Sequence, residues 1–247
     1  MIPAIINLKL KKFVKRLAHY FGFDVRRYHP STSETAQFMA MLSAHGINLI
    51  FDVGANTGQF GKSLRDAGYR GRIVSFEPLA AAREQLLWVS RNDALWDIAS
   101  RAAIGSEDGE IEIHVAGNSQ SSSVLGMLEA HASAAPESAY VGSEKVPLRR
   151  LDTLASGYFR PDSVSFLKID TQGYEDRVLQ GATGLLDRFV GLQLELSLVP
   201  LYEGQRLSDD LTAQVQASGF ELWAMSQVFS DPRSGRLLQI DATFFRH

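Results

Sequence analysis

The stretch that decides the fold of this chain reads Leu49-Ile50-Phe51-Asp52-Val53-Gly54-Ala55-Asn56-Thr57-Gly58-Gln59-Phe60. Its apolar first half has the length and composition of a strand buried in a parallel sheet. Two glycines and an asparagine end that strand, and a helical pattern begins at Gln59. Glycine has no Cβ, so the backbone of such a turn can approach a nucleotide-like ligand closely. Asp52 falls near the carboxyl end of the strand, where open α/β sheets bind their ligands.

A second strand and turn narrow the class of ligand. The run from Arg72 to Phe76 reads as another buried strand, and Glu77-Pro78 follows it directly. An acidic residue about 20 positions beyond a glycine turn is placed to accept hydrogen bonds from ribose hydroxyls. Glu77 stands about that far beyond Gly58. Together the two units predict a ribose-bearing cofactor, although they do not say which one.

Length and composition set the outer limits. At 247 residues, 45% of them hydrophobic, the chain suits one large α/β domain with additions. A net charge of −3 gives no reason to expect nucleic acid as a partner. The chain has no cysteine, which excludes disulfides, cysteine zinc sites and thiol nucleophiles. The absence of cysteine fits a reducing compartment, and we expect a cytoplasmic protein.

The charge is concentrated at the N-terminus. Residues 1–29 carry seven Lys and Arg against one Asp, a balance of +6 that leaves −9 for the remainder. Apolar residues lie between these charges largely at helical spacing, and the apolar stretch before Lys9 is too short for a secretory signal or a spanning helix. Two readings stay open. The helix lies on an anionic membrane surface or docks on a partner or biosynthetic complex, or it packs on its own domain or in a homodimer interface.

The chain divides into two parts by pattern. Residues 1–47 form a helical extension, with a Ser-Thr-Ser-Glu capping segment from Ser31, and residues 48–247 form the main domain. Residues 97–104 read as a third strand, and the small side chain of Ala103 at its end would flank an adenine. Residues 106–150 then break the strand–helix rhythm, with alternating runs on either side of a serine-rich loop. This pattern predicts a small antiparallel insertion near the ligand.

Two further strands carry acidic residues near their ends. Asp170 follows a buried strand and precedes a glycine turn, and Glu195 lies near the end of the next strand. Parallel strands would therefore bring Asp52, Glu77, Asp170 and Glu195 to one edge of the sheet. Buried carboxylates are costly unless they are paired, hydrogen-bonded or bound to a ligand. So many acids at strand ends predict a polar cleft at that edge.

The last elements complete a known arrangement. A helix over 209–218 precedes strands over 220–225 and 237–245, a terminal antiparallel pair after the strand–helix units. We therefore predict a Rossmann-like α/β domain of the class I methyltransferase type. Its central seven-stranded sheet is mostly parallel, with an antiparallel terminal strand. Four motifs carry a closer resemblance: Asp52-Val53-Gly54-Ala55-Asn56-Thr57-Gly58, Phe76-Glu77-Pro78, Leu167-Lys168-Ile169-Asp170-Thr171-Gln172-Gly173-Tyr174-Glu175 and Glu195-Leu196-Ser197. Over residues 48–225 the chain resembles the FkbM family of methyltransferases.

The resemblance implies S-adenosylmethionine as cofactor and O-methylation of a hydroxyl, commonly on a sugar, glycan or metabolite. It places four residues along the methionine end of the cofactor: Asp52, Gly54, Asn56 and Gly58. Glu77 would hold the ribose, and further contacts would come from Ala55, Pro78 and Ala103. Asp170 would stand beside the sulfonium and the incoming hydroxyl, as the first candidate for the general base, with Glu195 second. The sequence has no dedicated metal motif, and no metal is expected.

Two other functions compete with methyl transfer. An NAD(P)-dependent Rossmann enzyme would carry the Gly-x-Gly-x-x-Gly spacing, whereas Gly54 and Gly58 are separated by three residues of other types. A noncatalytic scaffold would have little reason to keep acids at every strand end. Binding of S-adenosylmethionine rather than NAD separates these functions. The acceptor is not identified by the sequence.

Overall fold

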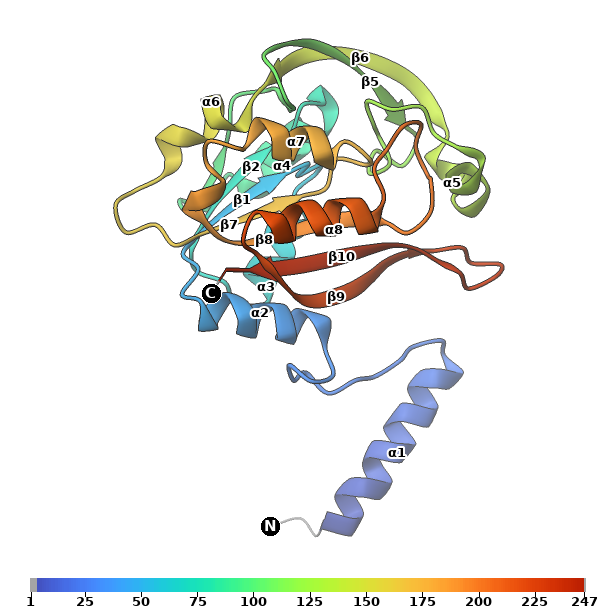
Figure 1. Cartoon of the computed structure of the whole chain (residues 1–247). Coiled ribbons are helices and arrows are strands. Elements are labelled where there is room, and N and C mark those ends of the chain that lie inside the picture. The colour runs from blue at the N-terminus through green and yellow to red at the C-terminus, as the bar shows by residue number, and fades with distance from the viewer. Residues whose placement is uncertain (1–3, 247) are drawn as a thin grey trace. The chain divides into compact units, whose positions relative to one another are not determined.

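The computed structural model describes residues 4–246, and side chains from Leu10 onward. The chain forms two compact units, Met1–Ser43 and Ala44–His247. The first unit contains α1 (Ala4–Tyr20), and α2 (Glu34–Ala44) follows (Figure 1). The backbone N–H of Ala36 donates to Ser33 Oγ at 3.3 Å, so the predicted capping segment does cap α2. In the described part of the chain, no helix has the length and apolar run needed to cross a membrane.

A seven-stranded sheet forms the centre of the second unit (Figure 1). Its strands are β1 (Leu49–Val53), β2 (Arg72–Phe76), β3 (Trp96–Ile98), β7 (Ser165–Ile169), β8 (Phe189–Ser197), β9 (Glu221–Ser230) and β10 (Leu237–Phe245). They lie in the order β3-β2-β1-β7-β8-β10-β9. The first five are parallel, and β10 pairs antiparallel with both β8 and β9. The predicted fold class is therefore confirmed, and β9 extends beyond its predicted end.

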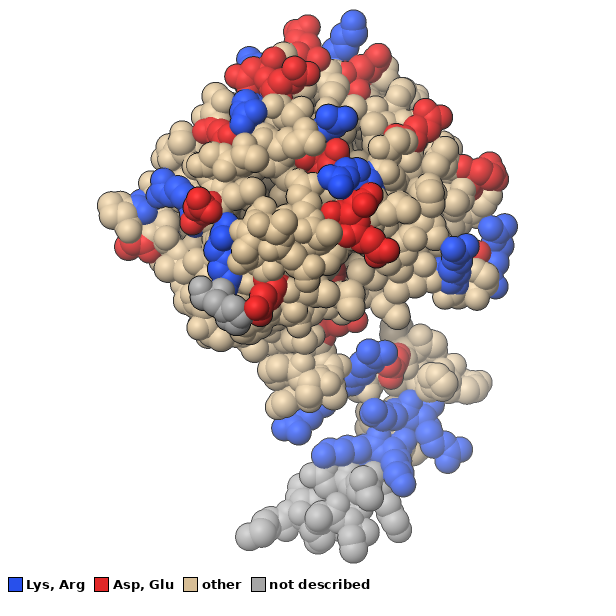
Figure 2. Space-filling view, viewed as in Figure 1, with Lys and Arg blue, Asp and Glu red and all other residues tan. Residues whose placement is uncertain are grey.

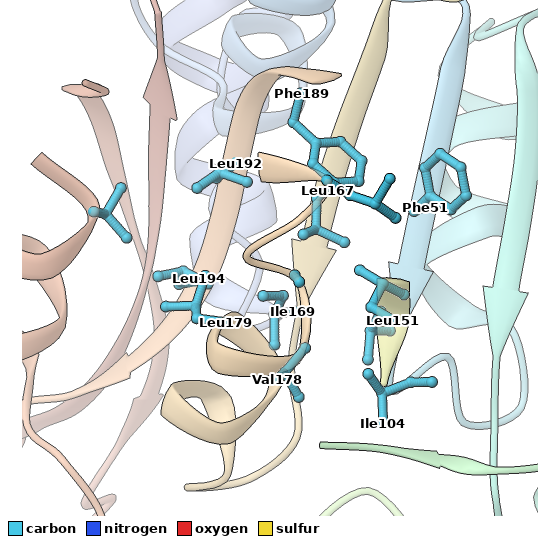
Figure 3. Packing of buried hydrophobic residues seen from close by; sticks show 14 of the residues in the cluster. Phe51, Ile104, Leu151, Leu167, Ile169, Val178, Leu179, Phe189, Leu192 and Leu194 are labelled. Carbon is cyan, nitrogen blue, oxygen red and sulfur yellow. The ribbon is translucent and has the colours of Figure 1, made fainter. Parts of the chain in front are cut away.

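Helices connect and cover the strands. They are α3 (Gln59–Asp66), α4 (Ala80–Ser90), α6 (Leu151–Ala155), α7 (Glu175–Gly181) and α8 (Ser208–Ala217). One buried cluster joins Leu151, Val178 and Leu211 of α6, α7 and α8 to strand residues such as Phe51 and Leu167 (Figure 3). All five residues of β1 and of β7 are buried, as expected for central parallel strands. This packing fixes the carboxyl ends of β1 and β7 beside each other.

The middle section forms a second, three-stranded sheet. It consists of β4 (Ala103–Ile104), β5 (Gly109–Ala116) and β6 (Tyr140–Arg149), with α5 (Glu129–Ala134) between β5 and β6. β5 and β6 pair antiparallel, as the alternating runs predicted, whereas β4 lies before the predicted insertion and pairs parallel with β6.

The prediction of one strand over residues 97–104 was wrong. The chain leaves the main sheet after Ile98 and enters the second sheet at Ala103. Hydrogen bonds from Arg83 to the Ala99 carbonyl and from Arg101 to the Pro78 carbonyl stabilise the segment between the two strands. The partners of these two bonds, Arg83 and Pro78, lie outside residues 97–104, so the local pattern could not reveal the break.

Candidate active site

The turn after β1 passes between the ends of β2 and β7. The backbone N–H groups of Gly54 and Ala55 both donate to the Phe76 carbonyl at 3.1 Å. Gly54 has φ +81°, and a Cβ at this position would lie 1.7 Å from the backbone oxygen of Asp170. No side chain fits there without a shift of backbone. The turn thus brings the backbone of β1 directly against that of β7, at the edge where both strands end.

Three of the predicted cofactor-binding residues are buried at this turn: Asp52, Ala55 and Gly58. Asp52 is fully buried, and Ser75 Oγ donates to its Oδ2 at 3.2 Å. Gly58 packs on the side chains of Leu86 and Trp96, and Ala55 is also buried. These three residues are not among those that line the neighbouring cleft.

A cleft opens at the carboxyl ends of β1, β2 and β7, next to the serine-rich loop of the insertion. Six predicted site residues line it: Gly54, Asn56, Glu77, Pro78, Ala103 and Asp170. Its apolar lining also includes Leu79, Ile104, Ile113 and Val124. Its hydroxyl-bearing lining consists of Ser119, Ser122, Ser123, Thr171 and Tyr174. The cleft therefore combines an apolar surface with carboxylates and hydroxyls, as small-molecule sites commonly do.

Glu77 is almost fully buried at the end of β2. Its Oε2 accepts a hydrogen bond from the Asn56 backbone N–H and its Oε1 accepts one from the Leu79 backbone N–H, each at 2.8 Å. Burial raises the pKa of Glu77 to about 7, although the two backbone donors oppose this shift. Each carboxylate oxygen can accept a further hydrogen bond, because it has more than one lone pair. Glu77 can thus bind a hydroxyl group while it holds the turn.

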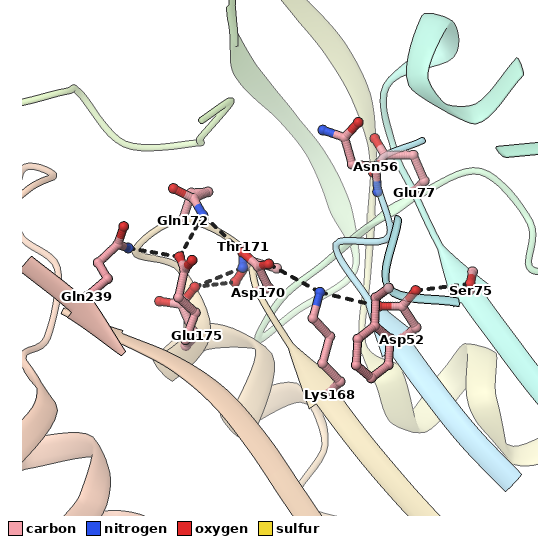
Figure 4. A network of polar contacts seen from close by, with 12 residues as sticks. Asp52, Asn56, Ser75, Glu77, Lys168, Asp170, Thr171, Gln172, Glu175 and Gln239 are labelled. Carbon is pink, nitrogen blue, oxygen red and sulfur yellow. Dashed lines mark hydrogen bonds and ion pairs between the residues drawn. The ribbon is translucent and has the colours of Figure 1, made fainter. Parts of the chain in front are cut away.

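Asp170 lies in the cleft with both carboxylate oxygens held (Figure 4). Lys168 Nζ lies 3.2 Å from Oδ2, and Gln172 Nε2 donates to Oδ1 at 2.9 Å. Lys168 is itself buried, and its Nζ is also 3.4 Å from Asp52 Oδ1. Burial disfavours the charged ammonium, but the carboxylates of Asp170, Asp52 and Asp241 together outweigh burial and raise the pKa of Lys168. The buried Lys168 thus holds the Asp170 carboxylate in position in the cleft.

Glu195 does not line the cleft, but Gln172 links it to Asp170. It is buried near the end of β8, where its Oε2 accepts hydrogen bonds from Gln172 Nε2 at 2.6 Å and Gln239 Nε2 at 2.8 Å. Burial, followed by the neighbouring carboxylates, raises the pKa of Glu195 well above its usual value. Gln172 therefore lies between Glu195, the second predicted base, and Asp170.

Backbone strain gathers at this site. Three non-glycine residues between positions 4 and 246 have a positive φ: Asn56 (+47°), Ser119 (+58°) and Gln172 (+54°). Asn56 and Ser119 line the cleft and are joined by a hydrogen bond of 3.2 Å, and Gln172 holds Asp170. Such conformations are costly and cluster at functional sites. Gln172 was not among the predicted site residues, and its position directly before a glycine in a strand-end turn was the available signal.

Glu175 supports the turn after β7. Its Oε1 accepts a hydrogen bond of 2.8 Å from the Thr171 backbone N–H, and its Oε2 accepts one of 3.0 Å from the Gly173 backbone N–H. Burial raises the pKa of Glu175 to about 7. Among the residues that the structure describes, no three His, Asp or Glu side chains are grouped so that they could hold a metal ion.

Comparison with known proteins gave one family match. The model of the methyltransferase FkbM domain matches residues 52–222. A comparison with curated protein sequences gave no match.

Several solved structures are similar to this chain at low sequence identity. A putative RNA methyltransferase from Pyrococcus horikoshii is 9% identical, with 86% of this chain and 82% of that chain covered and a TM-score of 0.44. A putative tRNA (m1A22) methyltransferase from Streptococcus pneumoniae, in complex with S-adenosyl-L-methionine, is 14% identical, with coverages of 85% and 72% and a TM-score of 0.46. Fibrillarin from Aeropyrum pernix, with natively bound S-adenosyl-L-methionine, is 13% identical, with coverages of 83% and 74% and a TM-score of 0.45.

Proposed function

Because the chain belongs to the FkbM family of S-adenosylmethionine-dependent methyltransferases, we propose that it methylates a hydroxyl group of a sugar in a glycan or glycosylated metabolite. The observation that carries this proposal is the Asp170 carboxylate, held in a cleft whose lining also includes apolar and hydroxyl-bearing side chains and the Glu77 carboxylate.

The lining of the cleft fits the cofactor. Leu79 and Ile104 offer an apolar surface for adenine, Glu77 can accept hydrogen bonds from ribose hydroxyls, and Gly54 leaves its side of the turn without a side chain. The carboxylates of Glu77 and Asp170 complement a positive sulfonium. When bound, the cofactor supplies an electron-poor methyl carbon for in-line displacement.

The chain's own residues would supply a general base and would align the acceptor hydroxyl with the methyl group. A hydroxyl oxygen is a weak nucleophile and loses its proton as it becomes an ether, whereas a neutral amine is already a good nucleophile and loses its proton only after the transfer. Asp170 can take that proton, since Lys168 and Gln172 fix its carboxylate while it still faces the cleft. General bases contribute ~10²–10⁴-fold to rates, and the alignment of the reacting groups contributes further. A positioned carboxylate therefore supports an oxygen acceptor.

The charge of the cleft supports a neutral polyhydroxyl acceptor over a nucleic acid. Among the described residues that line the cleft there is no Lys or Arg to pair with phosphates. The hydroxyls of Ser122, Thr171 and Tyr174 can each donate and accept hydrogen bonds, as recognition of sugar hydroxyls requires.

The experiment proceeds in two steps. Calorimetry with S-adenosylmethionine and, in parallel, NAD first tests occupancy of the cleft. The protein is then incubated with the cofactor and a panel of free glycosides, nucleotide sugars and matched amino sugars, and mass spectrometry detects the added methyl group. Methyl ethers on sugar hydroxyls support the proposal. Transfer to the amino nitrogens alone, with the hydroxyls untouched, contradicts it.

A further inference from the structure

The helix α1 has one apolar and one basic side. Four apolar residues recur at the spacing of a single helix face and are 43–63% exposed: Leu10, Phe13, Val14 and Leu17. Four basic residues fall between them and are also exposed: Lys11, Lys12, Lys15 and Arg16. The helix sequence contains neither Asp nor Glu. The apolar stripe is thus bordered by charge of one sign only.

The segment that follows α1 also exposes apolar and basic side chains. A groove within the N-terminal unit has both apolar and basic lining: Leu10, Val14 and Val25 with Lys11, Lys15, Arg26 and Arg27. Asp24 is the one acidic residue in the groove, and Arg26 already engages it at 2.7 Å. Aromatic side chains nearby are 63–84% exposed: Tyr20, Phe21, Phe23 and Tyr28. Figure 2 shows the basic side chains gathered on this part of the chain.

We propose that residues 10–28 dock the protein on an anionic lipid surface. The apolar face of α1 enters the boundary between headgroups and acyl chains, and the basic side chains lie at the level of the lipid phosphates. Exposed Phe and Tyr suit this boundary, because their rings are apolar and tolerate the hydrated headgroup layer. Docking is peripheral, since no described helix is suited to crossing a membrane.

A second copy of the chain is a poorer partner for this face. Pairing two α1 helices would bring ten Lys and Arg residues together with no acid from either helix to offset them. An anionic bilayer supplies the missing negative charge and also receives the apolar stripe. Charge complementarity therefore favours the lipid surface.

The test is co-sedimentation of the full-length protein with vesicles. One set is pure phosphatidylcholine and the other contains roughly a third phosphatidylglycerol, each at low and high salt. A charge variant replaces Lys11, Lys12, Lys15 and Arg16 by Gln. A control variant makes the same net change at exposed positions of the second unit, replacing Lys62, Lys145, Arg160 and Arg236 by Gln. A third variant, Phe13→Ser/Leu17→Ser, removes the apolar anchors.

We expect the wild type to bind only the anionic vesicles, and less at high salt. The charge variant should lose ~10²–10³-fold in partition coefficient, because each basic residue near such a surface contributes about fivefold. The control variant should bind as the wild type does, and Phe13→Ser/Leu17→Ser should bind weakly at either salt concentration. The proposal is overturned if the wild type ignores anionic vesicles at low salt, or if the control variant loses as much binding as the charge variant. It is also overturned if the wild type forms a dimer that Phe13→Ser/Leu17→Ser dissociates while vesicle binding is unchanged.

Discussion

Replacing Lys168 by Met should unbalance a buried charge cluster beneath the cleft. The Lys168 side chain is 7% exposed, and its Nζ lies 3.4 Å from Asp52 Oδ1 and 3.2 Å from Asp170 Oδ2. Asp52 is fully buried, and apart from Lys168 its carboxylate has one hydrogen bond, from Ser75. Removing one partner of a buried ion pair typically costs ~3–5 kcal/mol, because the remaining charge is left without compensation. Methionine keeps similar volume, so packing should add little to this cost.

The loss of stability in Lys168→Met should depend on pH. Burial raises the pKa of Asp52 in the folded chain, and loss of Lys168 should raise it further. A carboxyl with a raised folded pKa destabilises the fold as the pH rises above its unfolded value of about 4, because the unfolded chain releases the proton more readily. The gap between Lys168→Met and wild type should therefore be small near pH 4 and reach its full size in the neutral range.

Urea denaturation at a series of pH values measures this gap, and thermal unfolding should show a midpoint lowered by ~6–20 °C at neutral pH. The double variant Asp52→Asn/Lys168→Met serves as the matched control. It lacks the unpaired Asp52 carboxylate and should recover much of the lost stability. A loss below about 1 kcal/mol in Lys168→Met, the size typical of an exposed pair, would refute the reasoning, and so would a loss that the Asp52→Asn change does not relieve.

Three further perturbations test the cleft. Glu77→Gln should weaken S-adenosylmethionine binding by about tenfold to a hundredfold at pH 8. Wild-type affinity should fall as the pH drops through about 7, where Glu77 gains its proton, and calorimetry should find this slope flattened in the variant. Asp170→Asn should keep the fold and much of the cofactor affinity but lower turnover ~10²–10⁴-fold with an accepted sugar. An equal loss of turnover in the exposed control Asp162→Asn would contradict the role of Asp170 as general base. Gly54→Ala should abolish cofactor binding and lower stability, since its Cβ would lie 1.7 Å from a backbone oxygen. The control Gly235→Ala, with φ +72° but open surroundings, should lower the free energy of unfolding in urea by only about 1 kcal/mol.

Much of the strand pattern of the main domain could be read directly from the sequence. The bounds of β1 and β2 agree with the apolar runs before Gly54 and Glu77, because burial on both faces demands a continuous apolar segment. The placement of Gly54, Glu77 and Asp170 at one cleft also followed from the chain, since parallel strands end at the same edge of a sheet. Local pattern was sufficient for these features because each depends on residues close together in sequence.

Contacts between distant segments decided the rest. The register of β1 and β7 pairs Asp52 with Lys168, which makes Lys168 the counter-ion of two carboxylates. Gln172 stands between Asp170 and Glu195, so one of two similar strand-end acids faces the cleft and the other is buried behind it. Sheet order and side-chain packing fix these neighbours, whereas periodicity reports only which face of a strand is buried. The sequence alone therefore determined that Gly54, Glu77 and Asp170 lie at one edge of the sheet, and only the tertiary structure determined which strand-end acids line the cleft, because that depends on contacts across strands far apart in the chain.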